Sequence, residues 1–349
     1  MSIRYCKLIA VLAFFISGAK LLAYAEDPCK LSAVTVNGTG KADFKTVQEA
    51  IDHAPEAGSL IRIAPGTYRE KISIVHRCIR LVGTGTQPKD VVLSWNDSAM
   101  STGSTFKSGT VTVRADDFAA ENLTIENTWE VEHPEQDHHS QAVALQMSSD
   151  RAILDKVRLL GFQDTLYANS LTCEGSASTE PCQASRQYFR DCYIEGHVDY
   201  IFGDAKAVFD GCEMHSRHHS SVMITAQSRI SMTQDSGYFF LHCKITGENT
   251  SDRVYFGRPW RALATVLFYD TEIDQRLDPD GWGEWDGRLK TAIYREYCSH
   301  GPGVNGGHRK VEYPSLSNAE EVNLTPGSLL AGADHWNPIA TADQLAKLR

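Results

Sequence analysis

The chain has 349 residues, of which 42% are hydrophobic and 22% charged, the composition of a globular protein with a large core. Its formal net charge is −10, and removal of residues 1–25, which carry three basic residues, would change −10 to −13. This acidic balance argues against nucleic acid as a partner, and a polyanionic substrate would need a local binding site.

The first residues have the pattern of a secretory signal peptide. Arg4 and Lys7 precede a short apolar run, and the small-residue motif of residues 23–25 follows it. The run is too short to span a bilayer, although an anchoring helix is the alternative. We therefore expect residues 1–25 to be a signal peptide, and the mature chain to be secreted, extracellular and not membrane-bound.

A short helix is the first element expected in the mature chain, over residues 43–55, "DFKTVQEAIDHAP". Asp43 would be its N-cap and Pro55 would end it, and its apolar residues fall on one face. Because the helix precedes the repeats described next, it could cap the open end of a solenoid.

A six-residue pattern recurs along the chain with residues at its first, fourth and sixth positions that are usually apolar. The copies are "AENLTI" (120–125), "LDKVRL" (154–159), "FRDCYI" (189–194), "FDGCEM" (209–214), "FLHCKI" (240–245) and "FYDTEI" (268–273), and their fourth positions are 34, 35, 20, 31 and 28 residues apart. Spacings near twenty, lengthened by insertions, indicate an all-β solenoid in which each coil lays a short strand on the one before. A β-sandwich is the alternative, but tight hairpin signals are few. No linker is evident, so residues 26–349 should form one domain.

Eight of the nine cysteines lie beyond the signal peptide, and in a secreted chain disulfides are expected. Cys192 and Cys212 hold the same position in neighbouring copies, where stacked strands would place their Cα atoms about 5 Å apart. We predict a Cys192–Cys212 bond, with Cys243 as the rival partner, and a Cys173–Cys182 loop closure.

Familiar catalytic motifs are absent from the sequence. It contains no G-x-S-x-G, no H-E-x-x-H and no G-x-x-x-x-G-K-[ST]. The histidine groups His133/His138/His139 and His215/His218/His219 lie in polar stretches that indicate solvated loops rather than metal sites. We expect neither a metal nor another cofactor.

Polar residues stand inside otherwise apolar strands in four places. The segments are "SQAVALQ" with Gln141, "GFQDTLY" with Gln163 and Asp164, "HVDYIFG" with Asp199, and "FGRPW" with Arg258 and Trp260. A buried carboxylate costs several kcal/mol unless it is paired or used. In a solenoid, Gln141, Asp164 and Asp199 could be neighbours on three successive coils. Each residue alone has a structural explanation, but the set indicates a site.

These segments, with "GTYREKI", "FKTVQEAID" and "HWNP", resemble the characteristic segments of pectin methylesterases, in the family's order and over about residues 34–338. The loops at 171–186 and 274–310 are particular to this chain. The resemblance implies a right-handed parallel β-helix that hydrolyses the galacturonate methyl esters of pectin as a monomer.

The resemblance also implies a role for each polar residue. Asp199 would be the nucleophile and Arg258 its partner, and Asp164 would be the general acid and base. Gln141 and Gln163 would donate hydrogen bonds to the oxyanion. Trp260, Phe202 and Tyr167 would form apolar walls for the sugar, although Phe202 and Tyr167 could equally be packing residues.

Three alternatives remain open from the sequence. A glycosidase or lyase on the same fold could use Asp164 and Asp199, but a glycosidase has no acyl oxyanion for Gln141 and Gln163 to stabilise. A catalytically silent carbohydrate-binding β-helix would be expected to lose some of these polar residues. An esterase of the same fold could act on another ester, such as an acyl-CoA.

Overall fold

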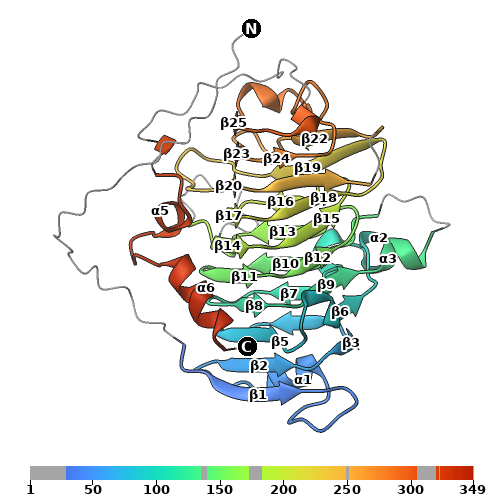
Figure 1. The fold of residues 1–349 in the computed structure, drawn as a ribbon, viewed down its shortest axis with the longest axis vertical. Helices are drawn as coiled ribbons and strands as arrows, with labels where there is room; N and C mark the ends of the chain where they lie inside the picture. The colour runs from blue at the N-terminus through green and yellow to red at the C-terminus, as the bar shows by residue number, and fades with distance from the viewer. Residues whose placement is uncertain are drawn as a thin grey trace.

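The protein is described here from a computed structural model, which covers residues 29–134, 140–172, 183–248, 251–304, 320–321 and 323–348. The expected signal peptide and the expected Cys173–Cys182 bond therefore lie outside the described residues. The described chain winds into a right-handed parallel β-helix built from three parallel sheets, with its coils stacked along the long axis (Figure 1). The solenoid expected from the sequence is confirmed.

Each regular coil contributes one strand to each sheet, in the order ten-stranded, eight-stranded, seven-stranded sheet. The ten-stranded sheet comprises β1 (Ser32–Val36), β2 (Ser59–Ile63), β5 (Ile79–Gly83), β8 (Ala119–Glu121), β11 (Ala152–Asp155), β14 (Arg186–Arg190), β17 (Lys206–Asp210), β20 (Gly237–Leu241), β23 (Thr265–Tyr269) and β25 (Ile293–Tyr297). The eight-stranded sheet comprises β3 (Gly66–Arg69), β6 (Val91–Trp95), β9 (Thr124–Asn127), β12 (Arg158–Leu160), β15 (Tyr193–Gly196), β18 (Glu213–Ser216), β21 (Lys244–Gly247) and β24 (Glu272–Ile273). The seven-stranded sheet comprises β4 (Ile72–Ile74), β7 (Val111–Val113), β10 (Leu145–Ser148), β13 (Leu166–Asn169), β16 (Ile201–Gly203), β19 (Ser221–Gln227) and β22 (Arg253–Gly257).

Short helices lie at the ends and in the loops of the solenoid. They are α1 (Val47–Asp52), α2 (Ala99–Thr102), α3 (Trp129–Glu132), α5 (Pro326–Leu330), α6 (Pro338–Ala346) and the 3₁₀ turns η1 (Pro88–Asp90), η2 (Thr105–Lys107), η3 (Arg288–Lys290) and η4 (Pro302–Val304). Within the described ranges, no helix is long and apolar enough to cross a membrane.

The recurring six-residue pattern crosses a turn, whereas the sequence suggested that each copy is one strand. Each copy runs from the ten-stranded into the eight-stranded sheet, as β8 runs into β9 through Asn122. The third position of every copy is left-handed, with φ between 50° and 64° at Asn122, Lys156, Asp191, Gly211, His242 and Asp270. Since Lys and His adopt this conformation reluctantly, the stacked turns must impose it.

The interior of the coil is filled by buried side chains stacked in columns. Phe189, Phe209, Phe240 and Phe268 are paired in register in the ten-stranded sheet, with successive ring centroids 4.5, 4.5 and 4.2 Å apart. All four rings are fully buried. Like therefore packs on like, because neighbouring coils repeat the same backbone geometry.

The predicted Cys192–Cys212 disulfide is wrong, although the two residues do occupy one column with Cys243. All three cysteines are buried and free. Cys212 Sγ donates to the Phe189 carbonyl (3.4 Å) and Cys243 Sγ to the Phe209 carbonyl (3.3 Å) of the preceding coil. In-register strands keep stacked Cβ atoms about 4.8 Å apart and their Cα–Cβ bonds parallel, whereas a disulfide needs Cβ atoms about 3.5–4.5 Å apart.

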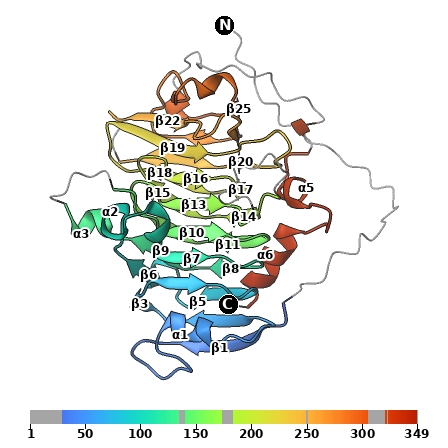
Figure 2. The same cartoon turned by 180° about the vertical axis from the view of Figure 1, so that it is seen from behind.

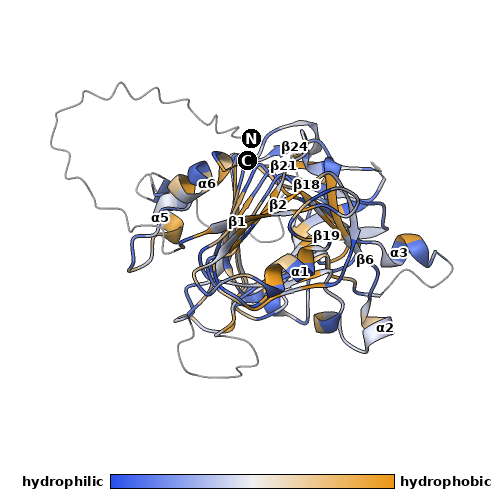
Figure 3. Ribbon diagram, turned by 90° about the horizontal axis from the view of Figure 1, so that it is seen from below, coloured by the Kyte–Doolittle hydropathy of each residue, from blue (hydrophilic) through white to orange (hydrophobic). Residues whose placement is uncertain are grey.

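Helix α1 covers the first coils and buries Val47, Ala50 and Ile51 in the core, as a capping helix should (Figure 3). It begins later than the sequence suggests, and its N-cap is Thr46, whose hydroxyl accepts from the Glu49 N–H at 3.2 Å. Asp43 is not the cap. Its carboxylate accepts from the Thr35 N–H (2.8 Å) and hydroxyl (2.9 Å) instead, beside the bridge between Val36 and Phe44.

The C-terminal helices α5 and α6 lie along the outer face of the ten-stranded sheet (Figures 1 and 2). Leu330, Trp336, Ala342 and Leu345 pack there on outward-facing residues of successive strands, including Tyr188. Ion pairs fasten this segment to the sheet, from Arg186 to Asp334 in the connection between the helices and from Arg190 to Asp343 in α6. The C-terminal segment thus covers an apolar stripe that the sheet would otherwise expose.

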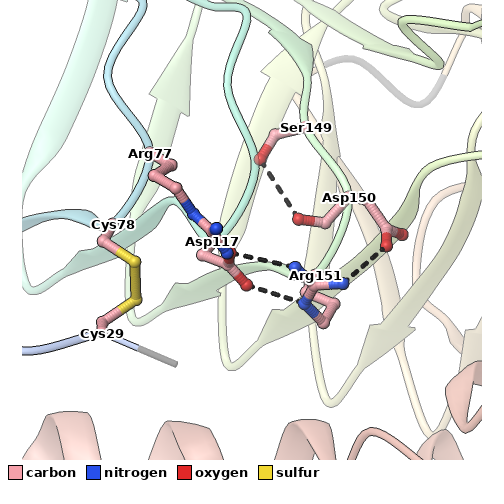
Figure 4. Close-up of a disulfide and its surroundings, with 7 residues drawn as sticks. All are labelled: Cys29, Arg77, Cys78, Asp117, Ser149, Asp150 and Arg151. Carbon is pink, nitrogen blue, oxygen red and sulfur yellow. Dashed lines mark hydrogen bonds and ion pairs between the residues drawn. A yellow bond between two sulfur atoms is a disulfide. The ribbon is translucent and has the colours of Figure 1, made fainter. Parts of the chain in front are cut away.

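A disulfide between Cys29 and Cys78 ties the start of the described chain to the turn before β5 (Figure 4). The sequence analysis assigned these two cysteines no partner. Beside the bond, Asp117 accepts from Arg151 at 2.7 and 2.9 Å and from Arg77 at 2.6 Å. The first coil is therefore fixed both covalently and by an ion-pair cluster.

Loss of this disulfide should destabilise the protein measurably. The bond closes a loop of 49 residues, for which the entropy of the unfolded chain accounts for about 4 kcal/mol. We expect Cys29→Ser/Cys78→Ser to lower the free energy of unfolding by a large part of that amount in denaturant titrations. An unchanged unfolding midpoint, with the bond shown intact in the parent protein by non-reduced peptide mapping, would contradict this.

The sequon at Asn122 should carry no glycan. Asn122 is 1% exposed, and its amide donates to the carbonyls of Gly83 and Gly85, both at 2.9 Å. A glycan on this nitrogen would have to displace the preceding coil. Glycopeptide mass spectrometry of protein secreted from a eukaryotic host should find Asn122 unmodified, with the exposed sequon at Asn323 as the comparison site.

Candidate active site

Two aspartates lie side by side where the chain enters the seven-stranded sheet. Asp164 comes just before β13 and Asp199 just before β16, and the pairing of Leu166 with Ile201 places the two aspartates at equivalent positions of neighbouring coils. The Asp164 N–H donates to the Val198 carbonyl at 3.1 Å. Gln141 comes before β10, the next strand of the same sheet, so the expected order on three successive coils is confirmed.

Both aspartates have a left-handed backbone, with φ 64° at Asp164 and 51° at Asp199. Such a conformation costs free energy in residues other than glycine and persists only where the surroundings impose it. It turns the chain sharply just before each strand. Sequence patterning gave no sign of these turns.

Arg258 holds Asp199 with two parallel hydrogen bonds. Its Nε donates to Oδ1 at 2.9 Å and its Nη2 to Oδ2 at 2.7 Å. Arg258 follows Gly257, where a Cβ atom would lie 2.0 Å from Thr225 Oγ1 and 2.4 Å from the Thr225 carbonyl oxygen. Only glycine allows this close approach to the Thr225 coil, and the Arg258 guanidinium reaches past that coil to the Asp199 carboxylate, two coils away.

The two carboxyl groups have unequal electrostatic environments. Asp164 is 8% and Asp199 6% exposed. Burial raises the pKa of Asp164 well above its usual range, and the charge of Asp199 raises it further. Burial also raises the pKa of Asp199, but the hydrogen bonds and charge of Arg258 oppose that shift. Asp199 therefore ionises first as pH rises, while Asp164 holds its proton.

Gln141 and Gln163 are anchored through their backbones and keep their side chains uncommitted. The Gln141 carbonyl accepts from the Ala99 N–H at 2.8 Å, and the Gln163 carbonyl accepts from the Ala142 N–H at 3.1 Å. Among the described residues, neither side-chain amide makes a hydrogen bond, and both side chains are half-buried. Their N–H groups are free to donate to a bound molecule.

An aromatic patch lies on the outer face of the seven-stranded sheet, separate from the interior core. It consists of Tyr167, Phe202 and Trp260, with Val143, Ala226 and Trp285. The Tyr167 and Phe202 rings stack at 4.6 Å, and the Trp260 ring is 6.0 Å from Phe202. The three aromatic residues predicted from the sequence are therefore brought together.

Two further aromatic residues of this region were missed by the sequence analysis. The Trp285 ring lies under the Arg258 guanidinium, 4.3 Å from it, and the Phe106 ring is 5.1 Å from Tyr167 and 46% exposed. Trp285 belongs to the loop at 274–310, which the sequence analysis treated as particular to this chain. The segment "GWGEWDG" could have signalled it, because a second tryptophan in a glycine-rich loop has no obvious place in the core.

The described residues offer a poor metal site. Cys29, Cys78 and Asp117 have ligand atoms within 4.8 Å of one another, but the sulfurs are joined in a disulfide and Asp117 is paired with two arginines. His215 lies in β18 rather than in the loop that was expected, and its Nδ1 is 2.7 Å from Thr246 Oγ1. His138 and His139 are outside the described residues.

Comparison with known proteins agrees with this arrangement. Residues 33–333 match the family model for pectinesterases. Pectinesterase 31 of Arabidopsis thaliana is 37% identical over 286 residues, which span 77% of this chain and 83% of that protein. Among solved structures, the pectin methylesterase from carrot superposes with a TM-score of 0.75 at 30% identity over 88% of this chain and 95% of its own. A pectin methylesterase in complex with a hexasaccharide superposes with a TM-score of 0.70 at 26% identity over 87% of this chain and 98% of its own. The chain belongs to the pectinesterase family and is an ester hydrolase.

Proposed function

We propose that the protein hydrolyses the methyl esters of galacturonate in pectin, with Asp199 as nucleophile and Asp164 as general acid and base. The observation that supports this best is the unequal pair of buried carboxyl groups, one held by Arg258 and the other, Asp164, with no ion pair among the described residues. An ester hydrolase needs an ionised group to attack and a protonated group to release the alcohol.

In the first half of the reaction, Asp199 attacks the ester carbonyl and forms a tetrahedral intermediate. The amides of Gln141 and Gln163 donate to its oxyanion, an interaction worth about 3 kcal/mol of barrier for one such donor. The intermediate collapses to an anhydride between Asp199 and the galacturonyl group. The methoxide leaves with the proton of Asp164, so the first product is methanol.

In the second half, Asp164 is ionised and accepts a proton from a water molecule. That water attacks the anhydride, which splits into the regenerated Asp199 carboxylate and galacturonic acid, and the acid then ionises to galacturonate by losing a proton to solvent. Arg258 keeps the Asp199 carboxylate in place through both halves, because its two donors fit the two carboxylate oxygens. Apart from the substrate and this water molecule, side chains of the protein carry out every step of the cycle.

The aromatic patch supplies apolar walls beside the reacting atoms. Trp260, Phe202 and Tyr167 can pack against the sugar ring and the methyl group, and Trp285 extends the wall behind Arg258. We further propose that residues 1–25 direct secretion and are removed, that residues 26–349 form the catalytic domain, and that it acts as an extracellular monomer.

The assay that tests this function measures methanol release and chain length together on methylated pectin. We expect methanol without any loss of viscosity. Shortening of the polymer would indicate the glycosidase or lyase alternative, and binding without either product would indicate a silent carbohydrate-binding protein. Activity on a different ester alone would contradict the substrate.

Substitutions of the two carboxyl groups should have graded effects on methanol release. Asp199→Asn removes the nucleophile, so the rate should fall by several orders of magnitude. Asp164→Asn leaves attack feasible but deprives methoxide of its proton, a loss of about 10²–10⁴-fold. Arg258→Ala should slow the reaction and also lower stability, because it leaves Asp199 buried and unpaired.

A matched control is Asp204→Asn. Asp204 is as buried as Asp164 and accepts from the Ser170 N–H (2.8 Å) and Gln234 Nε2 (2.9 Å), away from Arg258. It should cost stability but keep the rate. Methanol release by Asp199→Asn at a tenth of the parent rate or more would rule out Asp199 as the nucleophile.

The raised pKa of Asp164 should also make stability depend on pH. An unfolded Asp loses its proton near pH 4, before the folded Asp164 does, so Asp164 increasingly destabilises the fold as pH rises through this window. Asp164→Asn cannot ionise. Its free energy of unfolding relative to the parent should therefore rise from about pH 4 to the raised pKa and then level off. A difference independent of pH, measured by denaturant titration, would contradict the raised pKa.

A further inference from the structure

His197 is a buried histidine that the proposed reaction does not use. It lies two residues before Asp199 and is 2% exposed. Its ring is 5.8 Å from the Phe162 ring on one side and 4.9 Å from the His219 ring on another. Its backbone is bonded to both neighbouring coils, N–H to the Phe162 carbonyl (3.0 Å) and carbonyl to the Met223 N–H (2.8 Å).

The hydrogen bonds of the ring specify its tautomer. Nδ1 accepts from the Val198 N–H at 2.8 Å, so this nitrogen carries no proton. Nε2 lies 3.2 Å from Glu130 Oε1 and must carry the ring proton, which it donates to the carboxylate. The imidazole is therefore neutral and bridges a backbone amide to an acid.

Val198 connects the two carboxyl residues: it precedes Asp199 in the chain and is hydrogen-bonded to Asp164. Its N–H is held by the His197 ring, and its carbonyl accepts from the Asp164 N–H at 3.1 Å. Asp199 follows directly with its left-handed backbone. The orientation of this one residue thus bears on the position of both Asp164 and Asp199.

Glu130 comes from the other side of the site. It is in α3, between β9 and β10 in the chain. At the base of this connection, the Asn127 amide donates to the Val143 carbonyl at 3.0 Å and its Oδ1 accepts from the Trp129 N–H at 3.0 Å. The Glu130–His197 hydrogen bond thus connects α3 to the segment that carries Asp199.

We propose that His197 is a positioning residue, which Glu130 holds in place and which, through Val198, sets the position of Asp164 relative to Asp199. The inference rests on the proposed function, because it assigns the reaction to these groups. A displacement of about 1 Å in such a constellation can cost about 100-fold in rate. The link acts through Glu130 and Val198, and His197 itself makes no contact with the substrate.

The test compares variants of Glu130 by methanol release from methylated pectin. We expect Glu130→Ala to lower kcat about 10- to 100-fold with KM nearly unchanged, and Glu130→Gln, which keeps an acceptor oxygen, to recover most of it. The double variant Glu130→Ala/His197→Ala should be no slower than His197→Ala, because both changes break one bond. Equal loss in Glu130→Ala and Glu130→Gln, or additive losses, would overturn the proposal.

Glu132 provides the matched control in the same helix. It accepts from Arg69 at 2.9 Å and from Thr128 at 2.6 Å, and it does not contact His197. Glu132→Ala should lower the melting temperature and leave kcat within a few-fold of the parent. A fall in kcat equal to that of Glu130→Ala would show that holding α3 is all that matters, and would overturn the role of His197.

A second measurement does not depend on activity. Nitrogen NMR of the histidine side chains, with His197 assigned from His197→Gln, should show the proton on Nε2 in the parent and a changed signal in Glu130→Ala. A proton on Nδ1 would overturn the link. If the parent protein released no methanol, the proposed function would fail, and this spectrum would still decide whether His197 bridges Glu130 and Val198.

Discussion

Register between stacked coils is the constraint on which the rest of the structure depends. Parallel strands about 4.8 Å apart place each residue directly over its equivalent in the preceding coil. In the interior this stacks Phe189 on Phe209, and on the outer face it stacks Asp199 on Asp164. A site can therefore be assembled from segments far apart in sequence without any specially shaped loop, provided that each coil carries one suitable residue at the same position.

The same constraint creates an electrostatic problem, because two stacked carboxylates repel each other in a dry environment. The chain resolves it by treating them differently. Arg258 reaches Asp199 through the close approach at Gly257, and no cation pairs with Asp164 among the described residues. One group is thereby stabilised as an anion and the other as an acid. The asymmetry that a two-step ester hydrolysis requires thus follows from which coil carries the arginine.

Sequence patterns predicted the solenoid well, because it depends on side-chain chemistry repeated along the chain, and they singled out Asp164, Asp199 and Arg258, which the structure brings together. They failed where three-dimensional detail decides. The sequence showed that Cys192 and Cys212 occupy one column, but it did not show that their Cα–Cβ bonds run parallel, which prevents a disulfide. The sequence indicated Asp43 as a helix N-cap, but in the structure its carboxylate accepts hydrogen bonds from Thr35 instead. Trp285 was missed because its position depends on how a long loop returns to Arg258, which no local pattern encodes.

The two outer faces of the coil show why the site lies on the seven-stranded sheet. Both faces carry apolar side chains, such as Tyr188 on the ten-stranded sheet and Phe202 on the seven-stranded sheet. On the first face, α5 and α6 cover these residues and bury them permanently. On the second, Tyr167 and Phe202 are buried at 6% and 4% exposed, but the half-buried Trp260 and Trp285 and the exposed Phe106 leave apolar surface that a bound molecule can cover. The C-terminal segment therefore leaves one face for binding, and the stacked carboxyl groups lie at the entrance of that same face.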